Sequence, residues 1–160
     1  MNWFDSHCHL KGFKNKGNLE EILRRAEENG VSRMTAVGTS NEDWEIYKNL
    51  SEQYRDKIFY SVGLHPCYVN EGYESVIEKI ESYLGSGTPP VALGEIGLDY
   101  FHLPKNHNEA LSIIKNQKNA NKDKTGKQRK SDNVSRVEIS RPYIGWKKTM
   151  YSTISKWLWG

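Results

Sequence analysis

Two histidines one residue apart, His7 and His9, are the first residues with an obvious chemical use; they lie in the stretch FDSHCHL at residues 4–10. Side chains alternate along an extended strand, so residues i and i+2 point to the same side. Neutral imidazole is a common ligand of divalent metals, and two imidazoles at this spacing can share one ion. Two solvated histidines at a strand end fit the spacing equally well. Cys8, between them, should point the opposite way, into the core, as a small apolar residue.

Three further polar residues follow other short apolar stretches. His65 comes after IFYSVGL at residues 58–64, and Glu95 and Asp99 lie in the stretch ALGEIGLDY at residues 92–100. Carboxylates and imidazoles are the side chains that bind zinc, manganese or magnesium. A metal site would require that the fold bring these distant segments together.

The elements that must position these residues follow from hydrophobic spacing. Strands are predicted over 3–8, 34–37, 58–64 and 91–96. Between them, three helical stretches are predicted, with Asn18 and Glu21 as a capping box for the first and Gly30 and Gly85 as stops for the first and third. The order βαβαβαβ, with nearly continuous apolar strands, indicates a parallel sheet covered by helices. Because the carboxyl ends of parallel strands share one edge, the polar residues should meet there.

Three motifs carry a resemblance to a known family: FDSHCHL at 4–10, VGLHP at 62–66 and ALGEIGLDY at 92–100. In order and spacing they resemble the TatD-type metal-dependent hydrolases of the amidohydrolase superfamily, many of them deoxyribonucleases, over roughly residues 1–114. The resemblance implies an α/β fold, the first half of a (β/α)₈ TIM-type barrel with about four β/α units, because a full barrel needs about 250 residues.

The resemblance also implies roles for individual residues. His7 and His9 correspond to ligands of one metal, and Glu95 to a catalytic carboxylate that bridges two metals. His65 corresponds to a catalytic histidine beside the substrate phosphate, and Asp99 to a substrate-binding residue that supports the rim. The cofactors implied are divalent ions (Mg, Mn or Zn, two in the complete family site), and the substrate implied is DNA or another phosphodiester.

Part of the family's ligand set has no counterpart. The family takes two more histidines and an aspartate from later strands, whereas no histidine follows His107 and the only later aspartates, Asp123 and Asp132, lie in a polar stretch. We therefore expect little or no activity from the chain on its own. His102 and His107 are expected to be solvated loop residues, and Cys67 to have no partner.

The charge of the chain changes near residue 115. Residues 1–114 hold 11 Lys and Arg against 17 Asp and Glu, a net of −6, whereas residues 115–160 hold 12 against 3, a net of +9. Since 115–133 contains a single apolar residue, Ala120, we predict a domain over 1–114 and a basic, poorly ordered tail over 115–160. Val137 and Ile139 alternate like a short strand, and apolar residues at helical spacing follow over 146–158. A truncated or frame-shifted family member is the expected origin. The alternative function is a non-catalytic protein that binds nucleic acid through this tail.

Two cysteines make no disulfide framework, which favours a reduced, intracellular protein, expected in the cytoplasm. No apolar run reaches the roughly 20 residues that a membrane-spanning helix needs. A half-barrel has two open sheet edges and an exposed apolar flank, so self-association through the open side is expected.

Overall fold

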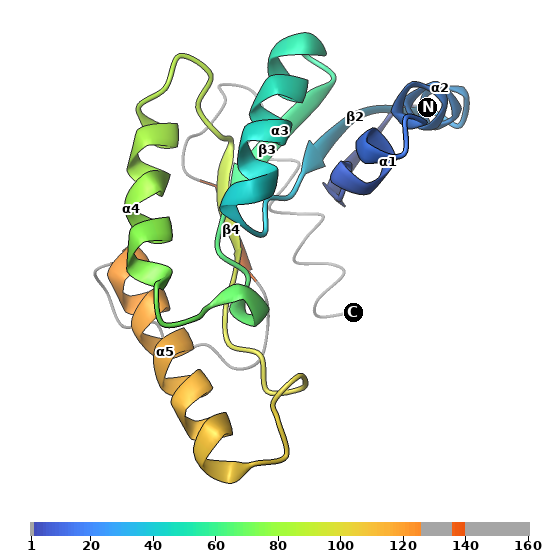
Figure 1. Ribbon diagram of the computed structural model, residues 1–160. Coiled ribbons are helices and arrows are strands. Elements are labelled where there is room, and N and C mark those ends of the chain that lie inside the picture. The colour runs from blue at the N-terminus through green and yellow to red at the C-terminus, as the bar shows by residue number, and fades with distance from the viewer. Residues whose placement is uncertain (1, 126–135, 140–160) are drawn as a thin grey trace.

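The computed structural model describes residues 2–125 and 136–139 and shows an α/β fold built on one five-stranded sheet (Figure 1). The strands are β1 (Trp3–Cys8), β2 (Val31–Ala36), β3 (Ile58–Val62), β4 (Ala92–Ile96) and β5 (Arg136–Ile139). The helices are α1 (Lys11–Asn15), α2 (Leu19–Glu28), α3 (Asn41–Gln53), α4 (Tyr73–Leu84) and α5 (His107–Thr125), with one 3₁₀ turn at Pro66–Tyr68.

The first four strands are parallel and lie in chain order, each joined to the next through helices. Pairs such as Asp5 with Met34, Met34 with Ile58, and Ser61 with Ala92 set the register. This arrangement is half of a TIM-type barrel, as the sequence predicted. The carboxyl ends of all four strands therefore lie along one edge.

The main core lies between α3 and the sheet. Trp44, Tyr47 and Leu50 of α3 are buried against Ile58 and Tyr60 of β3. Burying side chains of this kind stabilises the fold by roughly 1.5–3 kcal/mol each. These residues are spaced along one side of α3, and their burial anchors the helix that follows the carboxyl end of β2.

The cap of α3 holds the loop after β2. Ser40 has extended backbone angles (φ −153°, ψ 164°) and forms a capping box with Asp43. The Asp43 carboxylate accepts hydrogen bonds from the Thr39 and Ser40 amides, each at 3.1 Å. The capping box predicted at Asn18 and Glu21 is wrong: Asn18 precedes α2 with φ −114° and ψ 15°, outside the extended region that a capping side chain needs.

Helix α5 contradicts the expectation that order ends at Lys115. It continues to Thr125, and Gln117 and Ala120 are only 2% and 1% exposed. With Ile114 they form a buried stripe three residues apart, which is enough to dock a helix whose other side chains are mostly polar. Ala120 packs in a cluster with residues of the β3–α4 segment, and α5 contacts α4 (Figure 1). Apart from residues 136–139, the rest of the predicted tail lies outside the described residues.

The short strand expected around Val137 and Ile139 is β5, and it pairs antiparallel with β4. One of the two sheet edges expected to be open is therefore covered. In the described part of the chain, β1 has a neighbouring strand on one side only. The helical stretch predicted within 146–158 lies outside the described residues. Over the residues that the structure describes, no helix has the length and apolar character to cross a membrane.

Candidate metal centre

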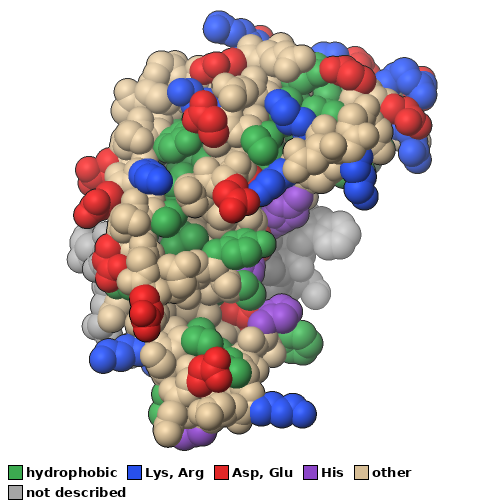
Figure 2. Space-filling view, viewed as in Figure 1, with side chains coloured by type: hydrophobic (Ala, Val, Ile, Leu, Met, Phe, Trp, Pro, Cys, Tyr) green, Lys and Arg blue, Asp and Glu red, His purple; other side chains and the backbone are tan. Residues whose placement is uncertain are grey.

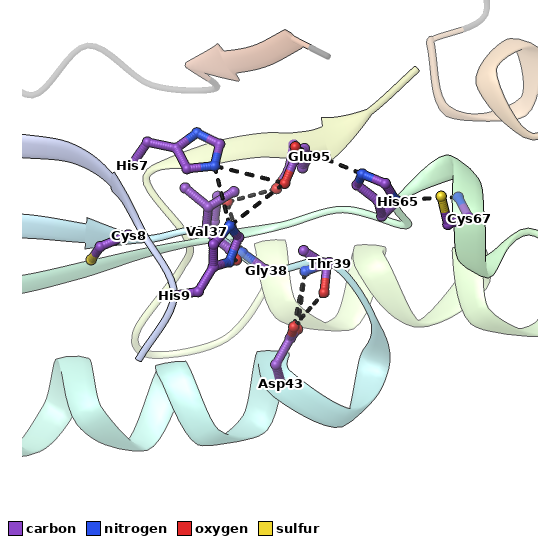
Figure 3. Close-up of polar contacts among 12 residues, drawn as sticks. His7, Cys8, His9, Val37, Gly38, Thr39, Asp43, His65, Cys67 and Glu95 are labelled. Carbon is purple, nitrogen blue, oxygen red and sulfur yellow. Dashed lines mark hydrogen bonds and ion pairs between the residues drawn. The ribbon is translucent and has the colours of Figure 1, made fainter. Parts of the chain in front are cut away.

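Four of the five predicted site residues meet at the carboxyl edge of the sheet (Figure 3). The Nε2 atoms of His7 and His9 lie 3.3 Å apart, and they are 3.7 and 3.9 Å from Oε2 of Glu95. The other carboxylate oxygen of Glu95, Oε1, lies 3.8 Å from Nε2 of His65. Glu95 thus lies between the histidine pair at the end of β1 and the histidine that follows β3. Each of the three segments comes from a different strand, so only the folded sheet brings them together.

The alternation of side chains along β1 explains the histidine pair. Cys8 points away from the cluster, as predicted, and its thiol donates to the Thr35 carbonyl oxygen at 3.3 Å (Figure 3). Burial, with a smaller contribution from the charge of Asp5, raises the pKa of the Cys8 thiol to about 12. This thiol is therefore protonated at neutral pH and acts as an apolar side chain.

A backbone carbonyl sets the orientation of His9. Nδ1 of His9 lies 3.1 Å from the Val37 oxygen at the end of β2. A carbonyl oxygen can only accept, so Nδ1 carries the hydrogen and Nε2 keeps its lone pair. That lone pair is directed to the space shared with His7 and Glu95, which is how histidine ligands of metals are commonly oriented.

His65 has the opposite arrangement. The amide of Cys67 donates to its Nδ1 at 3.2 Å, so Nδ1 is the acceptor and the hydrogen of the neutral ring is on Nε2. This Nε2–H faces Glu95 and the open side of the cluster. His65 can therefore donate a hydrogen bond to an oxygen of a ligand, whereas His9 can coordinate a metal.

Backbone contacts between three strand ends position Glu95. Its amide donates to the Gly38 oxygen at 3.1 Å. The buried Ser61 hydroxyl accepts from the Gly38 amide at 3.2 Å and donates to the Gly94 oxygen at 2.6 Å. A Cβ atom on Gly63 would lie 2.4 Å from the carbonyl carbon of Gly94, so only glycine allows the strands to approach this closely.

Gly38, Ser61 and Gly63 were not among the predicted site residues. The glycines that follow β2 and β3 within two residues were the available signal, because a glycine at a strand end often marks a close approach of another backbone.

The fifth predicted residue, Asp99, lies in a separate group. Its Oδ2 accepts from the Cys67 thiol at 2.9 Å and lies 2.6 Å from Nδ1 of His102. Partial burial raises the pKa of Asp99, but hydrogen bonds from Cys67, His102 and Phe101 outweigh it and hold the pKa well below its usual range. His102 lies on an exposed loop, as predicted, but it also bonds Asp99, and Cys67, for which the sequence implied no partner, bonds the same carboxylate. Cys67 is 32 residues from Asp99 along the chain and His102 lies on a loop without periodicity, so local spacing carried no signal of these contacts.

A pocket of about 820 Å³ opens beside the cluster. Its lining includes His9, His65 and Glu95, together with Lys11 of α1 and residues of the β2–α3 and β3–α4 segments. In Figure 2, purple histidine side chains follow the hollowed side of the molecule between the α1–α2 arm and the loop before α5. The volume is within the range of pockets that hold small ligands, about 300–1,000 Å³.

Comparisons with known proteins identify relatives of this chain. The family model described as TatD related DNase matches residues 4–123. The chain is 33% identical over 104 residues to the uncharacterized metal-dependent hydrolase YcfH of Escherichia coli K12, a match that covers 63% of this chain and 38% of that protein. It is 29% identical over 112 residues to the 3'-5' ssDNA/RNA exonuclease TatD of Pectobacterium carotovorum, covering 68% of this chain and 43% of that protein.

Solved structures show the same fold. The crystal structure of YJJV, a TatD homolog from Escherichia coli K12, superposes with a TM-score of 0.60 at 27% identity, covering 76% of this chain and 47% of that one. The chain thus spans about 40% of the length of the curated relatives it matches. Since the family model covers most of the chain, with the fold and the motif residues described above, this chain belongs to the TatD related DNase family.

Proposed function

We propose that this chain carries part of a metal-dependent phosphodiesterase centre. His7, His9 and Glu95 bind a divalent ion, and His65 contacts an oxygen of the phosphodiester. The observation that carries the proposal is the opposed orientation of two histidines around one carboxylate: His9 presents a lone pair and His65 presents an N–H. If His9 and His65 were only solvated, there would be no reason for one to present a lone pair and the other an N–H to the same carboxylate.

The donor set suits the proposed ion. Two imidazole nitrogens and one carboxylate match the three protein ligands of many catalytic zinc sites, and manganese and magnesium also accept carboxylate and imidazole. The hydrogen bond from His9 Nδ1 to the Val37 oxygen is the kind of outer contact that fixes a histidine ligand. A bound divalent ion supplies activation of water and neutralisation of charge on phosphoryl oxygens.

The protein's own residues then have distinct tasks. Glu95 has one oxygen toward the histidine pair and the other toward His65, so it can serve two neighbours at once, including the second ion that the family resemblance implies. His65 holds a substrate oxygen through Nε2–H. Asp99 supports the rim on which Cys67 and His65 lie, through its hydrogen bond with the Cys67 thiol.

The proposed substrate is single-stranded nucleic acid, the class named for the Pectobacterium relative. We expect slow turnover or none from this chain alone. In its described residues the cluster offers three ligands, and a two-ion site that holds both the attacking and the leaving oxygen requires more.

The test combines metal titration with a nuclease assay on end-labelled single-stranded DNA. We expect weak binding of manganese or zinc that is lost in His7→Ala and Glu95→Ala and kept in His107→Ala, which lies outside the cluster. Fast cleavage abolished by either substitution would contradict the expected low activity. Metal binding that neither substitution changes would refute the site.

The alternative, nucleic-acid binding through the basic residues of 115–160, predicts a different pattern. DNA binding by the full chain would then fall steeply with salt and would be the same with and without a chelator. Binding that requires the divalent ion supports the metal centre instead.

A further inference from the structure

A second group of side chains of the types that hold metals lies beside the same pocket, whose lining includes one of them, Cys67. Cys67 follows β3 and contributes Sγ, while Asp99 and His102 follow β4 and contribute Oδ2 and Nδ1. Sγ lies 2.9 Å from Oδ2 and 3.7 Å from Nδ1, and Oδ2 and Nδ1 are 2.6 Å apart. These atoms are distinct from those of the His7, His9 and Glu95 cluster, so the two groups can bind ions independently.

The two loops that carry this group are fixed from behind by one buried side chain. Gln117 of α5 is 2% exposed; its Oε1 accepts from the Asp99 amide at 3.0 Å and its Nε2 donates to the Pro66 oxygen at 3.2 Å. The Asp99 carboxylate is also oriented, because Oδ1 accepts from the Phe101 and His102 amides at 2.7 and 3.1 Å. Oδ2 is thereby left to face Cys67 and His102.

The separations suit a tetrahedral ion. A zinc ion at about 2.3 Å from sulfur and about 2.0 Å from nitrogen and oxygen places its ligand atoms roughly 3.3–3.6 Å apart. The distance of 3.7 Å between Cys67 Sγ and His102 Nδ1 already agrees with this. The two shorter distances, both to Asp99, are hydrogen bonds that an ion replaces, and each requires an opening of less than about 1 Å. His102 lies on an exposed loop, and its side chain can make that movement.

We propose that Cys67, Asp99 and His102 form a second metal site, selective for zinc-like ions, with its remaining position open to water or to a ligand in the pocket. On binding, the thiol proton leaves to solvent, and the thiolate and carboxylate together neutralise the two charges of the ion. The thiolate sets the selectivity, because soft sulfur ligands favour zinc over magnesium.

A reactive cysteine is the competing interpretation, and the geometry disfavours it. Nδ1 of His102 is engaged by Asp99 at 2.6 Å, and the thiol donates to the same carboxylate, so this imidazole nitrogen does not take the thiol proton. Partial burial and the hydrogen bond to Asp99 raise the pKa of Cys67 to about 11, which leaves the thiol protonated near neutral pH.

The test uses cobalt(II) as a spectroscopic substitute for zinc on the full chain. Cobalt bound to a thiolate gives a charge-transfer band in the near ultraviolet, which the histidine and carboxylate ligands of the first site do not give. We expect this band in the natural chain, and we expect zinc, but not excess magnesium, to abolish it. The sequence contains one other cysteine, Cys8, so Cys8→Ser is the matched control and should keep the band.

Substitutions separate this site from the proposed catalytic centre. Cys67→Ser should lose the band, and His102→Gln should weaken cobalt binding by at least about tenfold. His7→Ala should keep the band, so a failure of the proposed function leaves this result unaffected. Absence of the band in the natural chain, its persistence in Cys67→Ser, or its loss in His7→Ala would overturn the inference; circular dichroism of each variant verifies that it is folded.

Discussion

Replacing Gly63 with alanine should disturb both stability and metal binding, because the new methyl group would enter the backbone beside Glu95. An ideal Cβ at Gly63 lies 2.4 Å from the carbonyl carbon of Gly94, 2.6 Å from the Glu95 nitrogen and 2.8 Å from the Gly94 Cα. Carbon atoms pack at about 3.5–4.0 Å, so β3 and β4 must separate locally by roughly 1 Å. All three neighbours are backbone atoms and cannot rotate away.

The magnitude follows from that displacement. Overpacking of a close contact costs about 1–3 kcal/mol, which lowers the Tm by roughly 4–12 °C at about 4 °C per kcal/mol for a domain of this size. Glu95 is the residue after Gly94, so its position shifts with the displaced backbone. Disturbing the support of a metal ligand lowers the metal affinity about 10–100-fold. Gly63→Ala should therefore lose stability and metal affinity together.

The assay is thermal unfolding by circular dichroism together with manganese titration at a temperature where both variants are folded. Gly87→Ala is the matched control, since an ideal Cβ at Gly87 meets no atom within 4 Å. If Gly63→Ala and Gly87→Ala have equal Tm values, the packing argument is refuted. A lower Tm with unchanged metal affinity would show that this contact does not position Glu95.

Three further predictions concern other parts of the fold. Ser61→Ala should lower the free energy of unfolding by about 2 kcal/mol, because it removes the buried hydroxyl that bridges the ends of β2 and β4; Ser82→Ala, at an exposed site, is the control. The free energy of unfolding should fall as the pH rises from 10 toward 12, because burial raises the pKa of Tyr47 to about 12. The stabilising contribution of the neutral Tyr47 is complete below pH 10.0, the ordinary pKa, and is lost as the pH rises toward 12. Tyr47→Phe should therefore reduce this pH dependence. The chain should self-associate through the β1 edge, where Trp3 is 56% exposed, and Trp3→Lys should shift sedimentation toward the monomer.

Each of these predictions has a result that contradicts it. Equal unfolding free energies for Ser61→Ala and Ser82→Ala would show that the bridging hydroxyl is replaceable by water. Identical alkaline unfolding curves for the natural chain and Tyr47→Phe would remove the tyrosine from the explanation. A monomer at all concentrations in sedimentation would rule out association through β1.

The sequence alone determined the order and type of the first four strands and of α2, α3 and α4 between them, whereas the short helix α1 was not predicted. Apolar periodicity is a local property, so the spacing of Trp44, Tyr47 and Leu50 is sufficient to assign them to one buried face. The parallel order then implied a shared edge for His7, His9, His65 and Glu95, and the structure brings these side chains within 4 Å of one another in pairs.

Other features depended on contacts between segments far apart in the chain. The orientation of His9 is set by Val37, 28 residues away, and Asp99 bonds Cys67, 32 residues away. The buried amide of Gln117 donates a hydrogen bond to Pro66, 51 residues earlier, and Ala120 packs against residues of the β3–α4 segment, so α5 is docked by distant contacts through a stretch that appears too polar to fold.

Local spacing decides whether a residue lies on a helix or a strand and which way it faces. The partner that it meets is decided by how the elements pack. Packing between elements decides which hydrogen-bond role each imidazole takes and how closely the strands approach at Gly63. It also decides the pairing of Asp99 with Cys67 and His102. The identity of the candidate ligands could therefore be predicted from the sequence, whereas their protonation, their supports and the second group of ligands emerged only from the tertiary structure.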